Sequence, residues 1–113
     1  MSKDDAYVLD MLRAASLARQ FGKACTEAEF LEDVKTQSAV LHQLTVLGEA
    51  VRRVSARFRE RHPDVPWPQI AGLRHRIVHG YDEIDIDRVW EVIERDLSPL
   101  IGALERIAKR EPS

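Results

Sequence analysis

In the second half of the chain, three residues have side chains that can bind a phosphate group or act on it. Arg74 is followed after four residues by His79, and Tyr81 follows after one more. An arginine stays protonated at neutral pH and can hold two phosphate oxygens at once, and a histidine can take up or release a proton there. A tyrosine hydroxyl, with an ordinary pKa of about 10, can orient a phosphate but is a poor general base. This combination suits the cleavage of an RNA phosphodiester without a metal ion.

Such a cleavage needs a base for the 2′-hydroxyl, an acid for the leaving 5′-oxygen and a cation that stabilises the extra charge on phosphorus. We predict that Arg74 and His79 are the catalytic residues. Tyr81, His75 and Arg76 are predicted to orient the phosphate or the RNA, and His75 is a candidate for the second proton carrier. Because one chain offers few such groups, a two-fold dimer that brings two copies of the motif together is expected.

The apolar residues interleaved with the motif have helical spacing, so the segment is predicted to be the C-terminal half of a helix that stops at Gly80. On a regular helix, Arg74 and Tyr81 lie about 20° apart around the axis, while His79 lies about 140° from Arg74. Glycine tolerates the backbone angles that a helix ending needs. We therefore expect the helix to end or unwind at Gly80, so that the guanidinium, imidazole and phenol converge there.

Helices on both sides must position this segment. The first helix is predicted to begin near Asp4 or Asp5, and the capping box of Thr26 and Glu29 opens a short second helix. The longest element is predicted to run from about residue 33 to 61. Its apolar residues are spaced four and three apart, a heptad seam that packs against partner helices at a shallow angle. The seam consists of Val40, Leu44, Leu47, Val51, Val54 and Phe58.

Gly48 lies beside the seam in the middle of this predicted helix, where glycine costs about 1 kcal/mol relative to alanine. A close approach by another helix, from the same chain or from a second subunit, would explain it, and a tolerated defect is the alternative. The loop over residues 62–68 holds three prolines that cannot continue the helix. Trp67 is predicted to pack under this loop, with stacking on an RNA base as the alternative.

The acidic residues at 82–87 are interpreted as helix caps rather than as a metal site. The last helix should kink or restart at Ser98 and Pro99. No stretch alternates with the period of a strand. The sequence therefore predicts an all-α fold, an antiparallel four-helix-type bundle with an additional short helix, in a single domain over residues 1–113.

The composition fits such a domain. With 44% hydrophobic and 32% charged residues, the 113-residue chain resembles a soluble globular protein. Its single cysteine, Cys25, excludes an internal disulfide and a cysteine-based zinc cluster, and it suits a reducing cytoplasm. No apolar run approaches the length that spans a membrane. A cytoplasmic protein without membrane contact is expected.

The charge is unevenly distributed. The segment from Arg52 to His79 holds seven arginines against Glu60 and Asp64, a local formal charge of +5, and because the whole chain carries −2, the remainder carries −7. A basic patch beside a phosphate-binding motif favours a polyanionic ligand. In the alternative interpretation, the arginines between residues 57 and 61 only complement the negative end of a helix.

The same residues carry a resemblance to a known family. The spacing of Arg74, His79 and Tyr81 matches the R-x4-H-x-Y signature of the HepT-like toxins in the HEPN superfamily. One position differs, since the residue after the motif arginine is commonly asparagine in this family and is His75 here. Further segments resemble the family in the same order along the chain: residues 7–12, 47–50, 62–63, 65–67 and 85–90.

This resemblance implies an activity and partners. Members of the family act as metal-independent endoribonucleases, with the motif in a cleft at a homodimer interface and no cofactor. They are typically encoded beside an MNT-type nucleotidyltransferase, the antitoxin, which attaches AMP to the motif tyrosine, here Tyr81. The implied partners are therefore an RNA substrate, a second copy of the chain and this nucleotidyltransferase. Added phosphate charge and a bulky base at Tyr81 would block the entry of RNA.

Other interpretations of the motif remain open. Arg74 can form a structural ion pair with Glu49 or with an acid of the last helix. The spacing of His75 and His79 suits two metal ligands on one helix face, but no third ligand is evident and no metal site is predicted. A non-catalytic module that binds a nucleotide, RNA or a partner is the alternative function. A DNA-binding helix that uses Arg74, His75 and Arg76 is disfavoured, because recognition helices read bases mainly from their N-terminal part.

Overall fold

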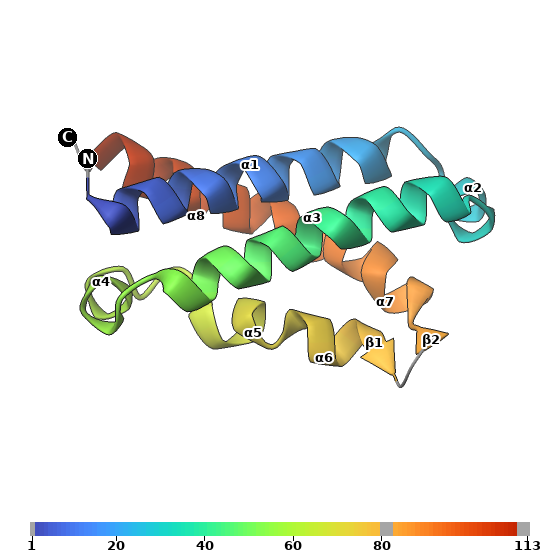
Figure 1. The fold of residues 1–113 in the computed structure, drawn as a ribbon. Helices are drawn as coiled ribbons and strands as arrows, with labels where there is room; N and C mark the ends of the chain where they lie inside the picture. The colour runs from blue at the N-terminus through green and yellow to red at the C-terminus, as the bar shows by residue number, and fades with distance from the viewer. Residues whose placement is uncertain (1, 80–82, 111–113) are drawn as a thin grey trace.

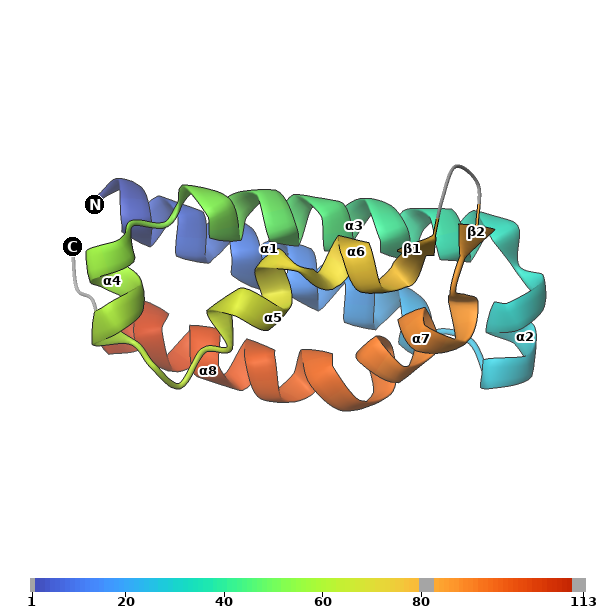
Figure 2. The same cartoon turned by 90° about the horizontal axis from the view of Figure 1, so that it is seen from below.

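The structure, a computed structural model, describes residues 2–79 and 83–110 of the chain (Figure 1). Its helices lie lengthwise in rows, and rows that follow one another in the sequence run in opposite directions (Figures 1 and 2). This arrangement confirms the predicted all-α class. Short helices α2 (Glu27–Glu32) and α4 (Ala56–Arg61) lie at the ends of the rows. The rows are formed by α1 (Lys3–Lys23), by α3 (Val34–Arg53), by α5 (Trp67–Ala71) with α6 (Leu73–Ile77), and by α7 (Ile86–Glu91) with the π-helical turn η1 (Val92–Asp96) and α8 (Leu97–Arg110).

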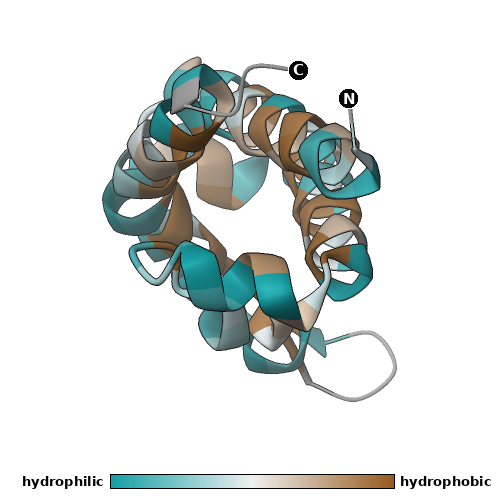
Figure 3. Cartoon of the chain, turned by 90° about the vertical axis from the view of Figure 1, so that its left-hand side faces the viewer, coloured by the Kyte–Doolittle hydropathy of each residue, from teal (hydrophilic) through white to brown (hydrophobic). Residues whose placement is uncertain are grey.

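The core lies between the rows, where the hydrophobic parts of the helices face one another (Figure 3). Helix α1 packs against α3 and α8, and α3 also packs against α5 and α6. Among the described residues no charged or polar side chain is buried. Any polar or charged functional side chain in that part of the chain is therefore at least partly exposed to solvent. All residues of the predicted heptad seam are buried: Val40, Leu44, Leu47, Val51, Val54 and Phe58.

The predicted long helix over residues 33–61 is wrong in one respect, because it is broken into α3 and α4. Val54 is extended at the break, and the hydroxyl of Ser55 caps α4 by accepting from the N–H of Phe58 at 3.2 Å. Arg59 donates to the carbonyl oxygen of Val51 at 2.8 Å and so satisfies one of the last carbonyls of α3. The apolar spacing continues across the break, which explains why the sequence pattern did not reveal it.

The start of α1 also differs from the prediction. Ser2, rather than Asp4 or Asp5, is the N-cap, and it forms a capping box with Asp5. The carboxylate of Asp4 instead accepts from the backbone N–H and the hydroxyl of Ser55, at 2.9 and 2.7 Å. Asp4 therefore ties the beginning of α1 to the corner between α3 and α4.

The predicted capping box of α2 is confirmed. Thr26 accepts from the N–H of Glu29 at 3.2 Å, and the Glu29 carboxylate accepts from the N–H of Thr26 at 2.9 Å. That backbone hydrogen bond, followed by the Thr26 hydroxyl, lowers the pKa of Glu29. At the start of α3, the hydroxyl of Thr36 and then its N–H lower the pKa of Asp33. Both carboxylates are thus held in the charged form that suits a helix N-terminus.

Two glycines on the long helices have different surroundings. A methyl group added at Gly22 of α1 would lie 2.7 Å from side-chain atoms of the buried Ile93. At Gly48 of α3 an added methyl would lie 3.8 Å from the carbonyl oxygen of Ile70, which is an ordinary contact. The neighbour of Gly48 is therefore α5 of the same chain, and a β-carbon would fit there.

The predicted interruption of the last helix takes the form of the π-turn η1. The N–H of Leu97 bonds to the carbonyl oxygen of Val92, five residues earlier. Proline lacks an N–H and its ring clashes with the carbonyl four residues before it, so Pro99 disturbs the regular pattern at Arg95, inside η1. No described helix combines the length and apolar composition that crossing a bilayer requires.

A small antiparallel hairpin was not predicted. Strand β1 (Val78–His79) pairs with β2 (Glu83–Ile84), with Val78 opposite Ile84 and His79 opposite Glu83. The N–H of Asp85 donates to the carbonyl oxygen of Ile77 at 2.7 Å and closes the hairpin. Strands of two residues are too short to show an alternating pattern in the sequence. The Asp85 carboxylate accepts from the N–H of Arg88, which confirms the cap interpretation at this residue.

Candidate nuclease site

The motif helix is shorter than predicted. A single helix ending at Gly80 was expected, but α5 and α6 are separate helices that meet at Gly72, and α6 ends at Ile77. The chain leaves the helix at Val78, which still donates a helical hydrogen bond but has extended backbone angles and pairs with Ile84 of β2. His79 therefore follows the helix by two residues, on an extended strand. The helical angle of about 140° between Arg74 and His79 does not apply to this geometry.

Arg74 is held at the surface by its neighbours on α6. Leu73 and Ile77 are 5% and 2% exposed and fix the helix against the core, which leaves Arg74, His75 and Arg76 exposed. The N–H of Val78 donates to the carbonyl oxygen of Arg74, which is the last helical hydrogen bond of α6. The apolar residues thus set the direction in which the basic side chains face.

Arg74 lines a small hollow between α6 and α3. The hollow measures about 20 Å³, which is room for about one water molecule. Within the described part of the chain, the guanidinium of Arg74 makes neither a hydrogen bond nor an ion pair. Glu49, the predicted structural partner, instead lies 3.5 Å from Arg52. The other residues around the hollow are Leu44, Thr45, Gly48, Glu49, Arg52 and Ala71.

Arg76 lies on the other side of α6. Its guanidinium donates to the carbonyl oxygen of Gln69 at 3.1 Å, and it lines a separate groove together with Arg95 and Asp96. This groove has a volume of about 390 Å³, within the range of small-molecule sites. Sequence reasoning missed it, because its walls come from α3, α5, α6, η1 and α8. Its apolar lining includes Leu47, Ile70, Leu73, Val92, Leu97 and Leu100.

The remaining motif residues are placed only in part. His75 is exposed on α6, and the backbone of His79 pairs with Glu83 in the hairpin. The side chain of His79 and the whole of Tyr81 lie outside the described residues. The predicted convergence of Arg74, His79 and Tyr81 therefore stays a prediction.

The described residues include no group of three or more histidines, cysteines, aspartates or glutamates placed to hold a metal ion. His75 lies on α6 and His79 on β1, so the two do not share a helix face as the metal interpretation required. In the described part of the motif, the exposed Arg74 guanidinium offers a binding group for an anion.

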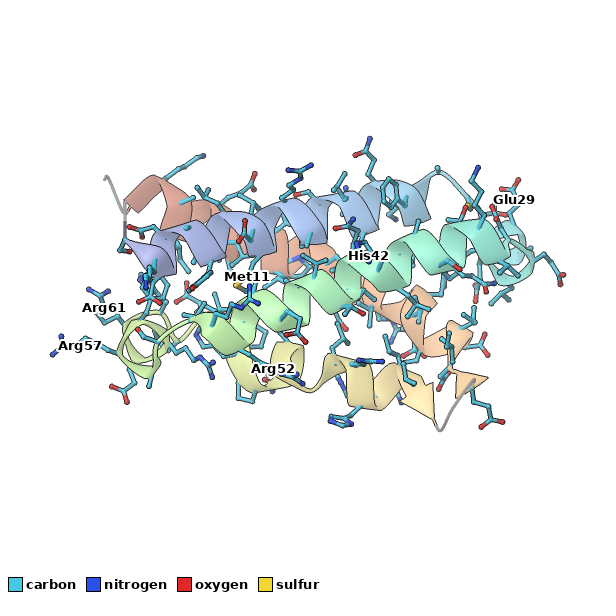
Figure 4. The ribbon with its side chains drawn as sticks, in the orientation of Figure 1. Met11, Glu29, His42, Arg52, Arg57 and Arg61 are labelled. Carbon is cyan, nitrogen blue, oxygen red and sulfur yellow. The ribbon has the colours of Figure 1, made fainter. Side chains whose placement is uncertain are left out.

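The arginines of the basic patch differ in their surroundings, because some contact other parts of α3 and α4 and others extend into solvent. Arg59 completes the C-terminal end of α3, as the helix-end interpretation expects, and the Arg61 guanidinium lies 5.5 Å from the centre of the Phe58 ring. Arg57 is exposed on α4 and points away from the bundle (Figure 4). Only part of the patch, mainly Arg52 with Arg74, borders the hollow described above.

The loop before the motif is anchored by Trp67, as predicted. Trp67 is 5% exposed, and its Nε1–H donates to the carbonyl oxygen of His62 at 2.9 Å. Its ring also lies edge-on to Phe58, with the centroids 6.3 Å apart. The alternative role of Trp67 in stacking on an RNA base is excluded by this burial.

Comparison with known proteins supports the resemblance to HepT-like proteins that the motif indicated. The family model described as Ribonuclease HepT-like matches residues 11–107. A protein of Thermococcus cleftensis named "Probable ribonuclease HepT" is 32% identical over 103 residues, which cover 91% of this chain and 94% of the relative. A Methanocaldococcus jannaschii protein named "Putative RNase MJ1380" is 35% identical over 107 residues, or 93% and 98% of the two chains. No solved structure matches the chain.

The family match begins in the middle of α1 and ends in α8, so it includes every row of helices and the whole motif segment. The chain belongs to the ribonuclease HepT-like family.

Proposed function

We propose that this protein is a metal-independent endoribonuclease in which Arg74 and His79 act on an RNA phosphodiester. The observation that carries the proposal is the exposed Arg74 guanidinium, which has no partner within the described residues and precedes His79 at the spacing of the family motif. The relatives named as ribonucleases support the same class of reaction.

The proposed reaction is an internal transfer of the phosphate. The 2′-oxygen loses its proton to a base and attacks the adjacent phosphorus, and the bond from phosphorus to the 5′-oxygen breaks as that oxygen accepts a proton. The products are a 2′,3′-cyclic phosphate and a 5′-hydroxyl end. His79 acts as the base or the acid, and Arg74 binds the non-bridging oxygens, whose charge grows in the transition state.

A second proton carrier is needed to complete this reaction. Either His75 or the second copy of the motif in a homodimer supplies it. Tyr81 orients the phosphate through its hydroxyl. Because Arg76 faces a different groove from Arg74, we assign it to RNA farther along the strand rather than to the reacting phosphate.

The same site is proposed to be regulated through Tyr81 in a toxin–antitoxin pair. A nucleotidyltransferase of the MNT type transfers AMP from ATP to the tyrosine oxygen, and pyrophosphate leaves. The added phosphate repels the RNA backbone, and the adenosine fills the space beside the motif. The modified protein would then no longer bind or cleave RNA.

End-group analysis of the RNA products tests the proposed reaction. Purified protein incubated with structured RNA in excess chelator should give fragments with 2′,3′-cyclic phosphate and 5′-hydroxyl ends. Products with 5′-phosphate ends, or activity that disappears with chelator and returns with zinc, would show that a different mechanism operates.

A further inference from the structure

Arg52 reaches from α3 toward the motif segment. Its Nη1 lies 3.5 Å from the Glu49 carboxylate, and its Nη2 donates to the carbonyl oxygen of Ala71 at 3.5 Å. Ala71 is the last residue of α5 and precedes Arg74 by three positions. Figure 4 shows Arg52 extending from α3 beside α5. The guanidinium of Arg52 is thus directed at the junction from which Arg74 projects.

The contacts of Arg52 leave it available to a ligand. Both are at the long limit of hydrogen bonding, and the side chains of Arg52 and Glu49 are 53% and 52% exposed. An exposed ion pair of this kind contributes little to stability. Its effect is to hold the guanidinium in place, so that an incoming anion meets an oriented donor.

The charges around the hollow favour an anion that bears more than one negative group. Arg52 and Arg74 contribute two positive charges, and Glu49 is the acidic residue that lines the hollow with them. Since the hollow has room for about one water molecule, the anion must lie across its mouth rather than inside it. A strand of RNA presents phosphates in succession along such a surface.

We infer that Arg52 forms a second phosphate subsite, which binds the RNA phosphate next to the one held by Arg74. This inference rests on the proposed ribonuclease function. It assigns the Glu49 carboxylate to positioning Arg52, and it places the RNA strand across α3 and α6. The competing explanation is that Arg52 only complements the negative C-terminal end of α3. That role would leave RNA binding unchanged when Arg52 is replaced.

The test measures RNA binding separately from cleavage. Protein carrying His79→Ala is titrated into a short, labelled single-stranded RNA at several salt concentrations, and the dissociation constant is obtained from fluorescence anisotropy. Adding Arg52→Ala should raise the dissociation constant about tenfold, because a charged hydrogen bond to phosphate is lost. The slope of log K against log salt should fall in magnitude by about 0.7, the value for one phosphate contact on a single strand.

Arg57→Ala is the matched control, since it removes the same charge from an exposed position on α4 that points away from the bundle. It should change the dissociation constant less than twofold and leave the salt slope unaltered. Arg52→Lys keeps the charge but loses the forked guanidinium, so it should bind with an intermediate affinity. Helical circular dichroism checks that each variant is folded. If Arg52→Ala does not fold, the RNA affinity of Arg52→Lys is compared with that of the control instead.

Equal affinity and salt slope in the Arg52→Ala and Arg57→Ala proteins would overturn the subsite, while RNA cleavage by the unmodified protein would still stand. If the unmodified protein neither binds nor cleaves RNA, both the proposed function and the subsite are wrong.

Discussion

Arg74 and Arg76 are two positions apart, yet they line different hollows, because successive residues on a helix turn by about 100°. Arg74 faces α3, where Arg52 and Glu49 lie, and Arg76 faces η1 and α8. The functional roles of neighbouring motif residues therefore depend on the rows that pack on each side of α6. The sequence predicted the motif residues, but the hollow beside Arg74 combines residues more than twenty positions apart, and no local pattern shows that.

The position of Arg76 predicts a modest effect of its replacement. Arg76→Ala should change RNA cleavage by no more than about threefold, chiefly through KM, because it loses a distant phosphate contact and not one to the reacting phosphate. Steady-state kinetics with a defined RNA measure both constants. A loss in kcat as large as that of Arg74→Ala would place Arg76 at the reacting phosphate.

The negative charge of the Glu49 carboxylate should weaken the binding of RNA to the wild-type protein. Glu49→Gln removes a negative charge beside the two arginines but keeps a side-chain oxygen that can still accept from Arg52 and position it. The dissociation constant for RNA should therefore fall about threefold at low salt. Glu60→Gln, which changes another exposed glutamate on α4, is the control and should have no such effect. Binding that is unchanged or weaker in Glu49→Gln would show that the carboxylate does not oppose the RNA.

Tyr81 should be the site of modification. Co-expression with a cognate nucleotidyltransferase should add the mass of AMP to the peptide containing Tyr81 and abolish RNA cleavage. Tyr7 is the internal control, because it is half-buried within α1. Tyr81→Phe should prevent the modification and remain active. Peptide mass spectrometry decides the site, and full activity in the modified protein would contradict the regulatory role.

The elements show where sequence patterns are informative. Burial of every heptad residue from Val40 to Phe58 was predicted, as were the cap at Thr26 and the interruption near Pro99. The break at Ser55 was missed, because the apolar spacing continues across it and one of its contacts comes from Asp4, fifty-one residues away. The hairpin was missed because its two strands pair over only two residues each. Local spacing therefore predicted the core, but it did not predict every position at which a helix ends.

The two glycines on α1 and α3 should respond oppositely to alanine. Gly22→Ala forces a methyl group against the buried Ile93 and should destabilise the protein by about 1–3 kcal/mol. Gly48→Ala meets only an ordinary contact and should stabilise it by about 0.5–1 kcal/mol, because alanine favours the helix. Thermal unfolding compares the two. If Gly22→Ala is the more stable variant, the close packing of α1 on η1 is not rigid.

At the scale of the whole molecule, none of the basic residues whose burial is described is buried, and Arg74 is among the exposed ones. An exposed guanidinium is screened by water, whereas stabilisation of a transition state is strongest where water is excluded. A second copy of the chain laid over the motif would exclude water and supply a second proton carrier. The need to exclude water and to supply a second proton carrier supports the proposed homodimer more than any single residue does.

The homodimer is testable by mass. Light scattering at micromolar concentration should report twice the 12.9 kDa of one chain. Mixing inactive Arg74→Ala and His79→Ala proteins should restore some cleavage if one active cleft needs residues from both copies. A monomer throughout the concentration range, with full RNA cleavage, would mean that a single chain holds the complete site.

The rate of RNA cleavage by Arg74→Ala, measured under single-turnover conditions with chelator present, tests the central claim most directly. Arg57→Ala serves as the control for loss of charge, and helical circular dichroism confirms that both variants fold. The proposed role of Arg74 predicts a rate at least about one hundredfold below that of the unmodified protein, with Arg57→Ala nearly unchanged. If Arg74→Ala cleaves RNA at the same rate as the wild-type protein, the assignment of Arg74 to the reacting phosphate is contradicted.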